Sequence, residues 1–236
     1  MKKDEVCALV KELGIIPAIR VDSNDDAHFA AEAVTRGGIP IVEITMTVPR
    51  AVELIAHLVK HHPQMVVGAG TLLDVEMARK CLDAGATFLT SPAFDLEIAQ
   101  FAIKENVTMI PGAMTPTEVV TAWKAGADFV KVFPCEQIGG EKYIKALNAA
   151  LPHIPLIAAG GVNQQTAAGF ISSGASAIGI GKELIPLDAI ELRKSDRIEE
   201  LAYRFKKIVT EARAGVEARK KRAAVQKDVG TEQCKA

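Results

Sequence analysis

A single lysine stands among apolar residues in the stretch ADFVKVFP, residues 127–134. Val and Phe dominate this stretch and a proline ends it, a pattern typical of a buried β-strand. Burying an ammonium ion is costly, and burial of an amine favours its neutral form. A neutral amine attacks carbonyl carbons and forms a Schiff base, which stabilises a carbanion on the neighbouring carbon. Lys131 is therefore a candidate for making or breaking carbon–carbon bonds through an imine.

A glutamate stands equally alone in IVEITMTVP, a second apolar stretch that reads as a strand. Glu43 and Lys131 carry opposite charges on different predicted strands, so they are candidates to meet inside one fold. In an imine mechanism a carboxylate moves protons to and from the carbinolamine, water and the enamine carbon. The alternative is a passive buried ion pair, although such a pair adds little stability.

Residues at three other predicted strand ends are candidates to hold an anion. Arg20 ends the first strand, and its guanidinium suits a carboxylate or a phosphate; an ordinary surface charge is the alternative. Gly160 and Gly161 follow the seventh strand, where backbone N–H groups can approach a phosphate. Lys182 follows the eighth strand and adds a point charge, and Asn163 is expected to cap a helix between them.

The elements that must position these groups are short apolar runs that alternate with helical patterns. The runs are continuously apolar, as expected for parallel strands covered on both faces. Strand followed by helix, repeated along the chain, predicts a single-domain (β/α)8 TIM barrel of the α/β class, with its active site at the carboxyl ends of the strands. The predicted strands are 14–20, 39–45, 65–70, 87–92, 108–113, 128–134, 155–161 and 176–181, and the clearest helices are 24–37, 50–61, 74–84, 94–105, 116–125 and 163–172.

The two ends of the chain differ from this repeat. The N-terminal stretch MKKDEVCALVKELG predicts a charged helix and lacks the apolar run of a signal peptide. We assign residues 1–213 to the barrel and residues 214–236 to a polar tail, a frayed helix extension followed by disorder. The basic run RKKR, 219–222, is interpreted as a solvated helix end rather than a polyanion site.

Composition narrows the classes of function. The formal net charge is −1 and aromatic residues make up 5% of the chain, which gives no electrostatic or stacking argument for nucleic acid. No apolar stretch is long enough to cross a membrane. The cysteines form no CxxC pair, so reduced thiols in a cytoplasmic protein are expected; they are Cys7, Cys81, Cys135 and Cys234.

Histidines are the remaining candidates for metal binding. His57, His61 and His62 occur in HLVKHH at a predicted helix end, with near-ligand spacing. No carboxylate lies beside them in the sequence, so a solvated helix face is the favoured interpretation. His28 and His153 are expected at the surface, and neither a metal nor a cofactor is predicted.

Six short motifs occur in one order along the chain: EITMTVP, VGAGT, TSPAF, MIPGAMTPTE, KVFP and GGVN. Together they resemble the KDPG/KHG aldolases, which are 2-keto-3-deoxy-6-phosphogluconate (KDPG) aldolase and 4-hydroxy-2-oxoglutarate (KHG) aldolase. The resemblance extends to about residue 210. It implies a metal-free class I aldolase on a (β/α)8 barrel, usually a homotrimer.

The resemblance also implies roles for individual residues. Lys131 matches the Schiff-base lysine of the KxFP motif, and Glu43 matches the general acid/base of the EIT strand. Substrate contacts fall on residues at the strand ends, which line the pyruvate site, bind an anionic group or form the phosphate loop: Arg20, Thr71, Pro92, Phe133, Gly160 and Gly161.

Two positions depart from the family pattern. Ala159 stands where the family usually has a Thr that helps to recognise the substrate beyond its pyruvate half, and Lys182 lies at or near a phosphate-binding Ser. The resemblance implies cleavage of KDPG to pyruvate and glyceraldehyde 3-phosphate, and of KHG to pyruvate and glyoxylate. The aldehyde half stays open, and cleavage of 2-keto-3-deoxy-6-phosphogalactonate (KDPGal) competes with these reactions. A phosphate-binding barrel epimerase or isomerase and a non-catalytic barrel also stay open as interpretations of the sequence.

Overall fold

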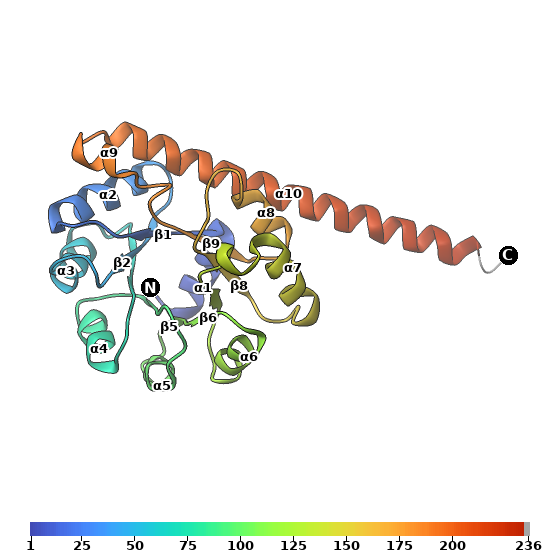
Figure 1. Ribbon diagram of the computed structural model, residues 1–236, viewed down its shortest axis with the longest axis horizontal. Helices are drawn as coiled ribbons and strands as arrows, with labels where there is room; N and C mark the ends of the chain where they lie inside the picture. The colour runs from blue at the N-terminus through green and yellow to red at the C-terminus, as the bar shows by residue number, and fades with distance from the viewer. Residues whose placement is uncertain (234–236) are drawn as a thin grey trace.

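The computed structural model describes the backbone of residues 1–233 and the side chains of residues 1–222. All paired strands are parallel and form one barrel wall, with helices packed outside it (Figure 1). The predicted TIM barrel is thus confirmed. The order around the wall is β5-β4-β3-β2-β1-β9-β8-β7-β6. The strands are β1 (Ile15–Ile19), β2 (Ile41–Thr45), β3 (Val66–Gly70), β4 (Phe88–Thr90), β5 (Thr108–Ile110), β6 (Gly112–Ala113), β7 (Val130–Val132), β8 (Leu156–Ala159) and β9 (Ala177–Ile180).

One of the predicted strands, 108–113, is divided in two. Pro111 separates β5 from β6, because proline has no N–H to donate to a ladder. β5 pairs with β4 and β6 pairs with β7, so these two halves of one predicted strand bring the ends of the sheet together. The carbonyl of Pro111 accepts a hydrogen bond from the Lys131 N–H at 2.9 Å, which continues the wall across the break.

The helices follow the strands and cover the outside of the wall. Several begin at a side chain that accepts a backbone hydrogen bond, including Ser23, Asp74, Asp95 and Thr115. Thr115 and Glu118 form a capping box, with Pro116 in the first turn. The helices are α1 (Lys3–Leu13), α2 (Asn24–Arg36), α3 (Ala51–His61), α4 (Val75–Asp83), α5 (Leu96–Lys104), α6 (Pro116–Lys124), the 3-10 turn η1 (Glu136–Ile138), α7 (Gly140–Ala150), α8 (Ala167–Ser172), α9 (Leu187–Glu191) and α10 (Ser195–Gln233).

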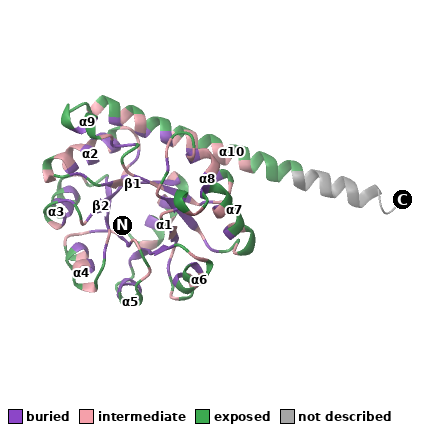
Figure 2. Ribbon diagram, in the orientation of Figure 1, coloured by how far each residue is buried: buried purple, intermediate pink, exposed green. Residues whose placement is uncertain are grey.

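The core occupies both faces of the wall, and the buried residues lie on the strands and on the inner faces of the helices (Figure 2). Inside the barrel, Phe88 of β4 is fully buried against β3. A Cβ atom at Gly68 would lie 2.2 Å from the Phe88 ring, so only glycine leaves room for it. This contact shows that alternate residues of β3 and β4 face the interior.

The C-terminal helix α10 passes α9, α2 and α8 and then extends well beyond the barrel (Figure 1). Phe205 and Val209 are fully buried, and Arg213 donates hydrogen bonds to the carbonyls of Glu12 and Ser176. The boundary that we expected after residue 213 falls inside one continuous helix, and residues 234–236 lie outside the described part of the chain. Among the described residues, no helix combines the length and the apolar character that crossing a bilayer requires.

We expect a chain that ends at Val216 to keep its melting temperature within about 2 °C, since Arg213 is the last described residue of α10 to donate hydrogen bonds to the barrel. Thermal unfolding followed by circular dichroism measures this. A chain that ends at Ile208 is the control and should melt at a clearly lower temperature, because it also lacks Val209 and Arg213. A fall of more than about 4 °C in the longer truncation would contradict the assignment of residues 1–213 as the structural unit.

Candidate active site

The Lys131 side chain reaches into the barrel from β7 and is half-buried. Its Nζ atom donates to the Thr90 hydroxyl of β4 at 3.4 Å and lies 5.8 Å from the centre of the Phe133 ring. β4 and β7 are not neighbours in the wall, because β5 and β6 lie between them. The contact between Lys131 and Thr90 therefore crosses the interior of the barrel.

Glu43 reaches into the same interior from the opposite wall. Its strand, β2, is separated from β7 by β1, β9 and β8 in one direction and by β3, β4 and the divided strand in the other. The Glu43 side chain is 6% exposed, and a Cβ atom at Gly70 would lie 2.0 Å from its Oε1 atom. The carboxylate thus occupies space that exists because position 70 has no side chain.

Lys131 and Glu43 do not form an ion pair. Within the described residues no carboxylate oxygen lies within 4.0 Å of the Lys131 Nζ atom, and Glu43 takes part in no salt bridge. The alternative of a passive buried ion pair is therefore wrong for this structure. The described contacts of the amine are the Thr90 hydroxyl and the Phe133 ring.

Arg20 and Thr71 meet above the strand that carries Glu43. Arg20 follows β1 and Thr71 follows β3, and the Arg20 Nη2 atom donates to the Thr71 hydroxyl at 3.2 Å. Thr71 has φ of 61°, in the left-handed region that a threonine rarely adopts. Strained backbone of this kind gathers at functional sites, where the surrounding structure holds it. The exposed guanidinium and the hydroxyl together form a polar edge of the mouth.

Pro92 and Phe133 form an apolar edge on the other side of the mouth. Both line a cavity of about 420 Å³ at the carboxyl ends of the strands, together with Phe94 and Met114. A Cβ atom at Gly112 would lie 2.0 Å from the Pro92 carbonyl oxygen, so glycine allows this loop to approach the wall beside β7. Phe133 is 37% exposed, which leaves its ring face available next to Lys131.

The loops after β8 and β9 carry the predicted anion-binding glycines. Gly160 and Gly161 have φ values of 84° and 87°, which only glycine adopts without strain. Within the described residues, the N–H groups of Gly160, Gly161 and Lys182 donate to no protein acceptor. β8 and β9 are neighbours, so the exposed Lys182 side chain and these N–H groups belong to one part of the mouth.

Asn163 caps this region as expected, although not at the first residue of α8. Its side-chain oxygen accepts hydrogen bonds from the N–H groups of Gln165 and Thr166, which form a turn before the helix starts at Ala167. The Thr166 hydroxyl in turn donates to the Gly161 carbonyl at 3.1 Å. These bonds hold the glycine loop in one conformation.

A family model for KDPG and KHG aldolase matches residues 6–201. The chain belongs to the KDPG and KHG aldolase family. It is 30% identical to a 2-dehydro-3-deoxy-phosphogluconate aldolase of Pseudomonas aeruginosa over 72% of this chain and 78% of that protein. The protein is therefore an enzyme of the aldolase class, a carbon–carbon lyase.

Solved structures agree with this assignment. A native KDPGal structure has a TM-score of 0.78 and 31% identity, and the match covers 85% of this chain and 96% of that one. A KDPG aldolase from Legionella pneumophila, with pyruvate captured as a covalent carbinolamine intermediate, has a TM-score of 0.78 and 27% identity over 84% of this aldolase and 96% of that chain.

Two residues of the aldolase site escaped the sequence analysis. Thr90 and Gly70 had no assigned role, yet one holds Lys131 and the other makes room for Glu43. The alternation of side chains along a strand could have placed Thr90 inside the barrel, because it shares a strand face with Phe88, two positions before it. The sequence does not show which strands lie opposite one another across the barrel, so the contact between Thr90 and Lys131 could not be predicted.

Cys135 does not provide a second nucleophile. Its thiol is fully buried, and burial, aided by the negative charge of Glu136, raises the pKa of Cys135 to about 12. The thiol is therefore protonated at neutral pH, and a protonated thiol is a poor nucleophile.

The expectation that the histidines near residue 60 lack a carboxylate partner is wrong. Glu32 of α2 lies 3.7 Å from His62 and 3.8 Å from His28, measured from carboxylate oxygen to ring nitrogen. The partner was missed because it comes from the preceding helix. His28 is also less exposed than expected: burial lowers the pKa of His28, while the neighbouring Glu32 opposes that shift.

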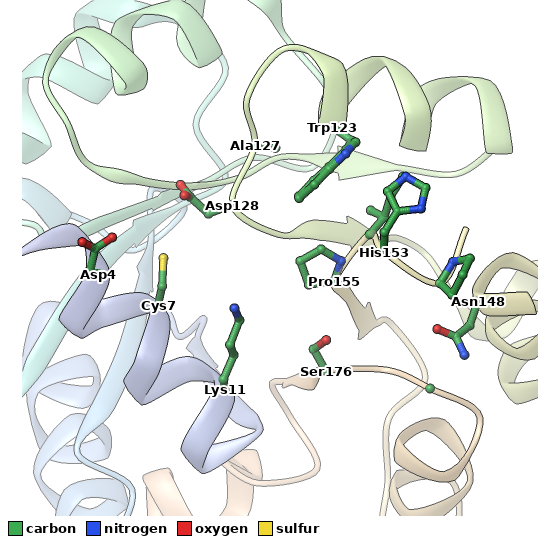
Figure 3. A pocket seen from close by; sticks show the side chains of 13 residues that line it. Asp4, Cys7, Lys11, Trp123, Ala127, Asp128, Asn148, His153, Pro155 and Ser176 are labelled. Carbon is green, nitrogen blue, oxygen red and sulfur yellow. The ribbon is translucent and has the colours of Figure 1, made fainter. Parts of the chain in front are cut away.

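A polar cleft of about 480 Å³ lies at the other end of the barrel (Figure 3). Asp4, Cys7 and Lys11 of α1 face residues that precede β7, β8 and β9, among them Asp128 and Ser176. Barrel enzymes build their chemistry at the carboxyl ends of the strands, so this cleft is not the catalytic site.

We expect Gly70→Ala to lower kcat about 10²-fold or more while the fold is kept, because the added methyl group would displace the Glu43 carboxylate. Glu43→Gln should show a loss of about 10²–10⁴-fold if the carboxylate moves protons. Steady-state aldolase assays, with circular dichroism as a check on folding, measure both. Gly215→Ala is the matched control, since nothing lies within 4 Å of its added Cβ atom. A loss smaller than about threefold in both site variants would remove Glu43 from proton transfer.

Proposed function

We propose that this aldolase is a class I enzyme in which Lys131 forms an imine with the keto group of a 2-keto-3-deoxy sugar acid. The observation that supports this most directly is an amine at the barrel mouth that has a hydroxyl neighbour, Thr90, and no carboxylate partner within the described residues. A lysine in this position can act as a nucleophile without first breaking an ion pair.

The reaction follows from imine chemistry. The Lys131 nitrogen attacks the C2 carbonyl carbon, and loss of water from the carbinolamine gives a protonated imine. The C4 hydroxyl then loses its proton, the C3–C4 bond breaks, and its electron pair moves into the imine to form an enamine. C4 leaves in the aldehyde product. Protonation of C3 and addition of water to the imine release pyruvate and restore the lysine.

Glu43 is the residue that we assign to the proton transfers. It approaches the interior from the wall opposite Lys131, so a substrate carbon bound to the lysine lies between the two side chains. It is nearly buried and hydrogen-bonds to no other described residue, so its oxygen atoms are available to water and substrate. A carboxylate in this place can take the proton of the C4 hydroxyl and serve the carbinolamine and the enamine carbon in turn.

The edges of the mouth provide the binding groups. Arg20, held by Thr71, suits an anionic group of the substrate, and Pro92 with Phe133 gives an apolar surface beside the imine. The Gly160 and Gly161 N–H groups and Lys182 suit a terminal phosphate. The proposed substrate is therefore KDPG, which yields pyruvate and glyceraldehyde 3-phosphate, and KHG is a second candidate. No metal or cofactor takes part in this chemistry, and a cytoplasmic homotrimer stays a prediction.

KDPGal is favoured as a further substrate by one observation. Ala159 ends β8 beside the glycine loop, is 7% exposed, and carries no hydroxyl. KDPG and KDPGal differ only in the configuration at C4, and a site without a hydrogen-bonding group at this place discriminates weakly between the two. We therefore propose that this aldolase cleaves both C4 epimers.

Borohydride reduction in the presence of pyruvate tests the imine. We expect the protein to gain the mass of one pyruvate less one oxygen atom, with the adduct on the peptide that contains Lys131. Lys131→Ala should show neither adduct nor turnover, whereas Lys182→Ala, which removes an exposed amine, should keep the adduct. Folded wild-type protein that cleaves KDPG without trapping pyruvate would exclude the class I mechanism.

Parallel assays of KDPG and KDPGal test the substrate. We expect Ala159→Thr to change the ratio of kcat/KM for the two epimers by about 5–10-fold, the effect of one added hydrogen bond. Pyruvate trapping in this variant is the control and should be unchanged, since the pyruvate half is bound elsewhere. An unchanged ratio would show that position 159 does not contact the C4 hydroxyl.

A further inference from the structure

Three histidines from two helices meet on the outside of the barrel. His28 comes from α2, His57 from α3, and His62 from the residue that ends α3. One nitrogen of each ring lies within 4.8 Å of the nitrogens of the other two. The centre of the His28 ring lies 5.1 Å from the centre of the His57 ring and 5.4 Å from that of the His62 ring. Among the described residues, these three histidines place their ring nitrogens close enough together to share one metal ion.

The local backbone explains how the three rings converge. His57 and His62 are five residues apart, which would place them on different faces of a regular helix. His62 leaves the helical conformation, with φ of −127° and ψ of 67°, and its N–H caps α3 by donating to the Leu58 carbonyl. The end of the helix thus turns His62 toward α2. On α2, His28 and Glu32 are four residues apart and share one face.

The His28 ring has an unexplained nitrogen. Its Nε2 atom is buried and has no hydrogen-bond partner within the described residues. A buried polar atom without a partner is uncommon in folded proteins and is destabilising, and a bound ligand would remove this cost. The other nitrogen of the ring, Nδ1, lies 3.8 Å from Glu32, which leaves Nε2 as the atom available to an ion.

Glu32 completes the arrangement. Its two carboxylate oxygens lie 3.8 Å from His28 and 3.7 Å from His62. Metal-binding histidines commonly direct their second nitrogen to a carboxylate, which orients the ring and increases its basicity. The carboxylate also offsets the charge that a cation would bring to a partly buried place.

We propose that His28, His57 and His62 bind a divalent transition-metal ion, with zinc the best match, and that Glu32 supports the site from its second layer. Imidazole nitrogens suit zinc, copper, nickel and cobalt, whereas magnesium and calcium prefer oxygen ligands. Zinc binds nitrogen at about 2.0–2.1 Å, so tetrahedral ligand atoms lie about 3.3 Å apart. His57 is exposed and His28 and His62 are partly exposed, so side-chain rotations would bring the three nitrogens to this separation. Three histidines leave a fourth position for water.

This site is separate from the aldolase reaction. Its ligands lie on helices outside the wall, while Lys131 and Glu43 lie on strands and point to the interior. An ion shared by α2 and α3 would clamp two neighbouring helices together, and binding to the folded state alone raises stability. The inference therefore concerns stability and metal binding, and it stands whether or not Lys131 forms an imine.

Cobalt and zinc titrations of the full-length chain, produced without a histidine tag and stripped with a chelator, test the site. We expect one equivalent of Co²⁺ to give the visible absorption of a tetrahedral complex, which Zn²⁺ then displaces. We expect zinc at hundredfold excess over its Kd to raise the melting temperature by roughly 5–10 °C. Aldolase turnover should be the same before and after chelation.

Single substitutions assign the ligands. His28→Gln, His57→Gln and His62→Gln should each abolish the cobalt spectrum and the zinc-dependent rise in melting temperature. His61→Gln is the matched control and should bind metal normally. The centre of the exposed His61 ring lies 4.4 Å from the centre of the His57 ring, but His61 is not one of the three histidines whose nitrogens converge. His57 is exposed, so its loss should leave the fold of the metal-free protein intact. Absence of saturable binding to the wild type, or equal binding by the His57→Gln variant, would overturn the proposal.

Discussion

The Lys131 amine, which has no carboxylate oxygen within 4.0 Å among the described residues, is the feature on which the rest of the site depends. A buried charge is ordinarily paired, because desolvation is costly. Lys131 instead has the Thr90 hydroxyl as a neighbour, lies over the Phe133 ring at 5.8 Å from its centre, and is partly exposed.

Small residues on β3 make this separation possible. Gly68 leaves space for the Phe88 ring, and Gly70 leaves space for the Glu43 carboxylate. Both glycines face the interior because residues two apart share one face of a strand. Thr71 follows this strand directly, and its hydroxyl accepts a hydrogen bond from the Arg20 guanidinium. One short strand thus positions the acid/base candidate and the anion-binding candidate together.

The outside of the barrel has its own organisation. The α2 and α3 helices carry the histidine group, and α10 crosses the outer faces of α2 and α8 before leaving the barrel. These features lie on the outer side of the wall, whereas the candidate catalytic side chains come from the strands. The polar cleft beside α1 likewise lies at the opposite end of the barrel from the candidate active site.

Local patterns in the chain are enough to predict the strands, the capping side chain of Asn163, and the isolated charges Lys131 and Glu43, because each depends on residues close in sequence. The alternation of strands and helices also predicted a barrel, and the resemblance of six motifs to the KDPG/KHG aldolases predicted an aldolase. Contacts between distant residues required the three-dimensional structure. Thr90 meets Lys131 across 41 positions, Arg20 meets Thr71 across 51, and Glu32 lies beside His62 from another helix. Periodicity shows which face a side chain occupies, but only closure of the wall fixes which residues stand opposite one another.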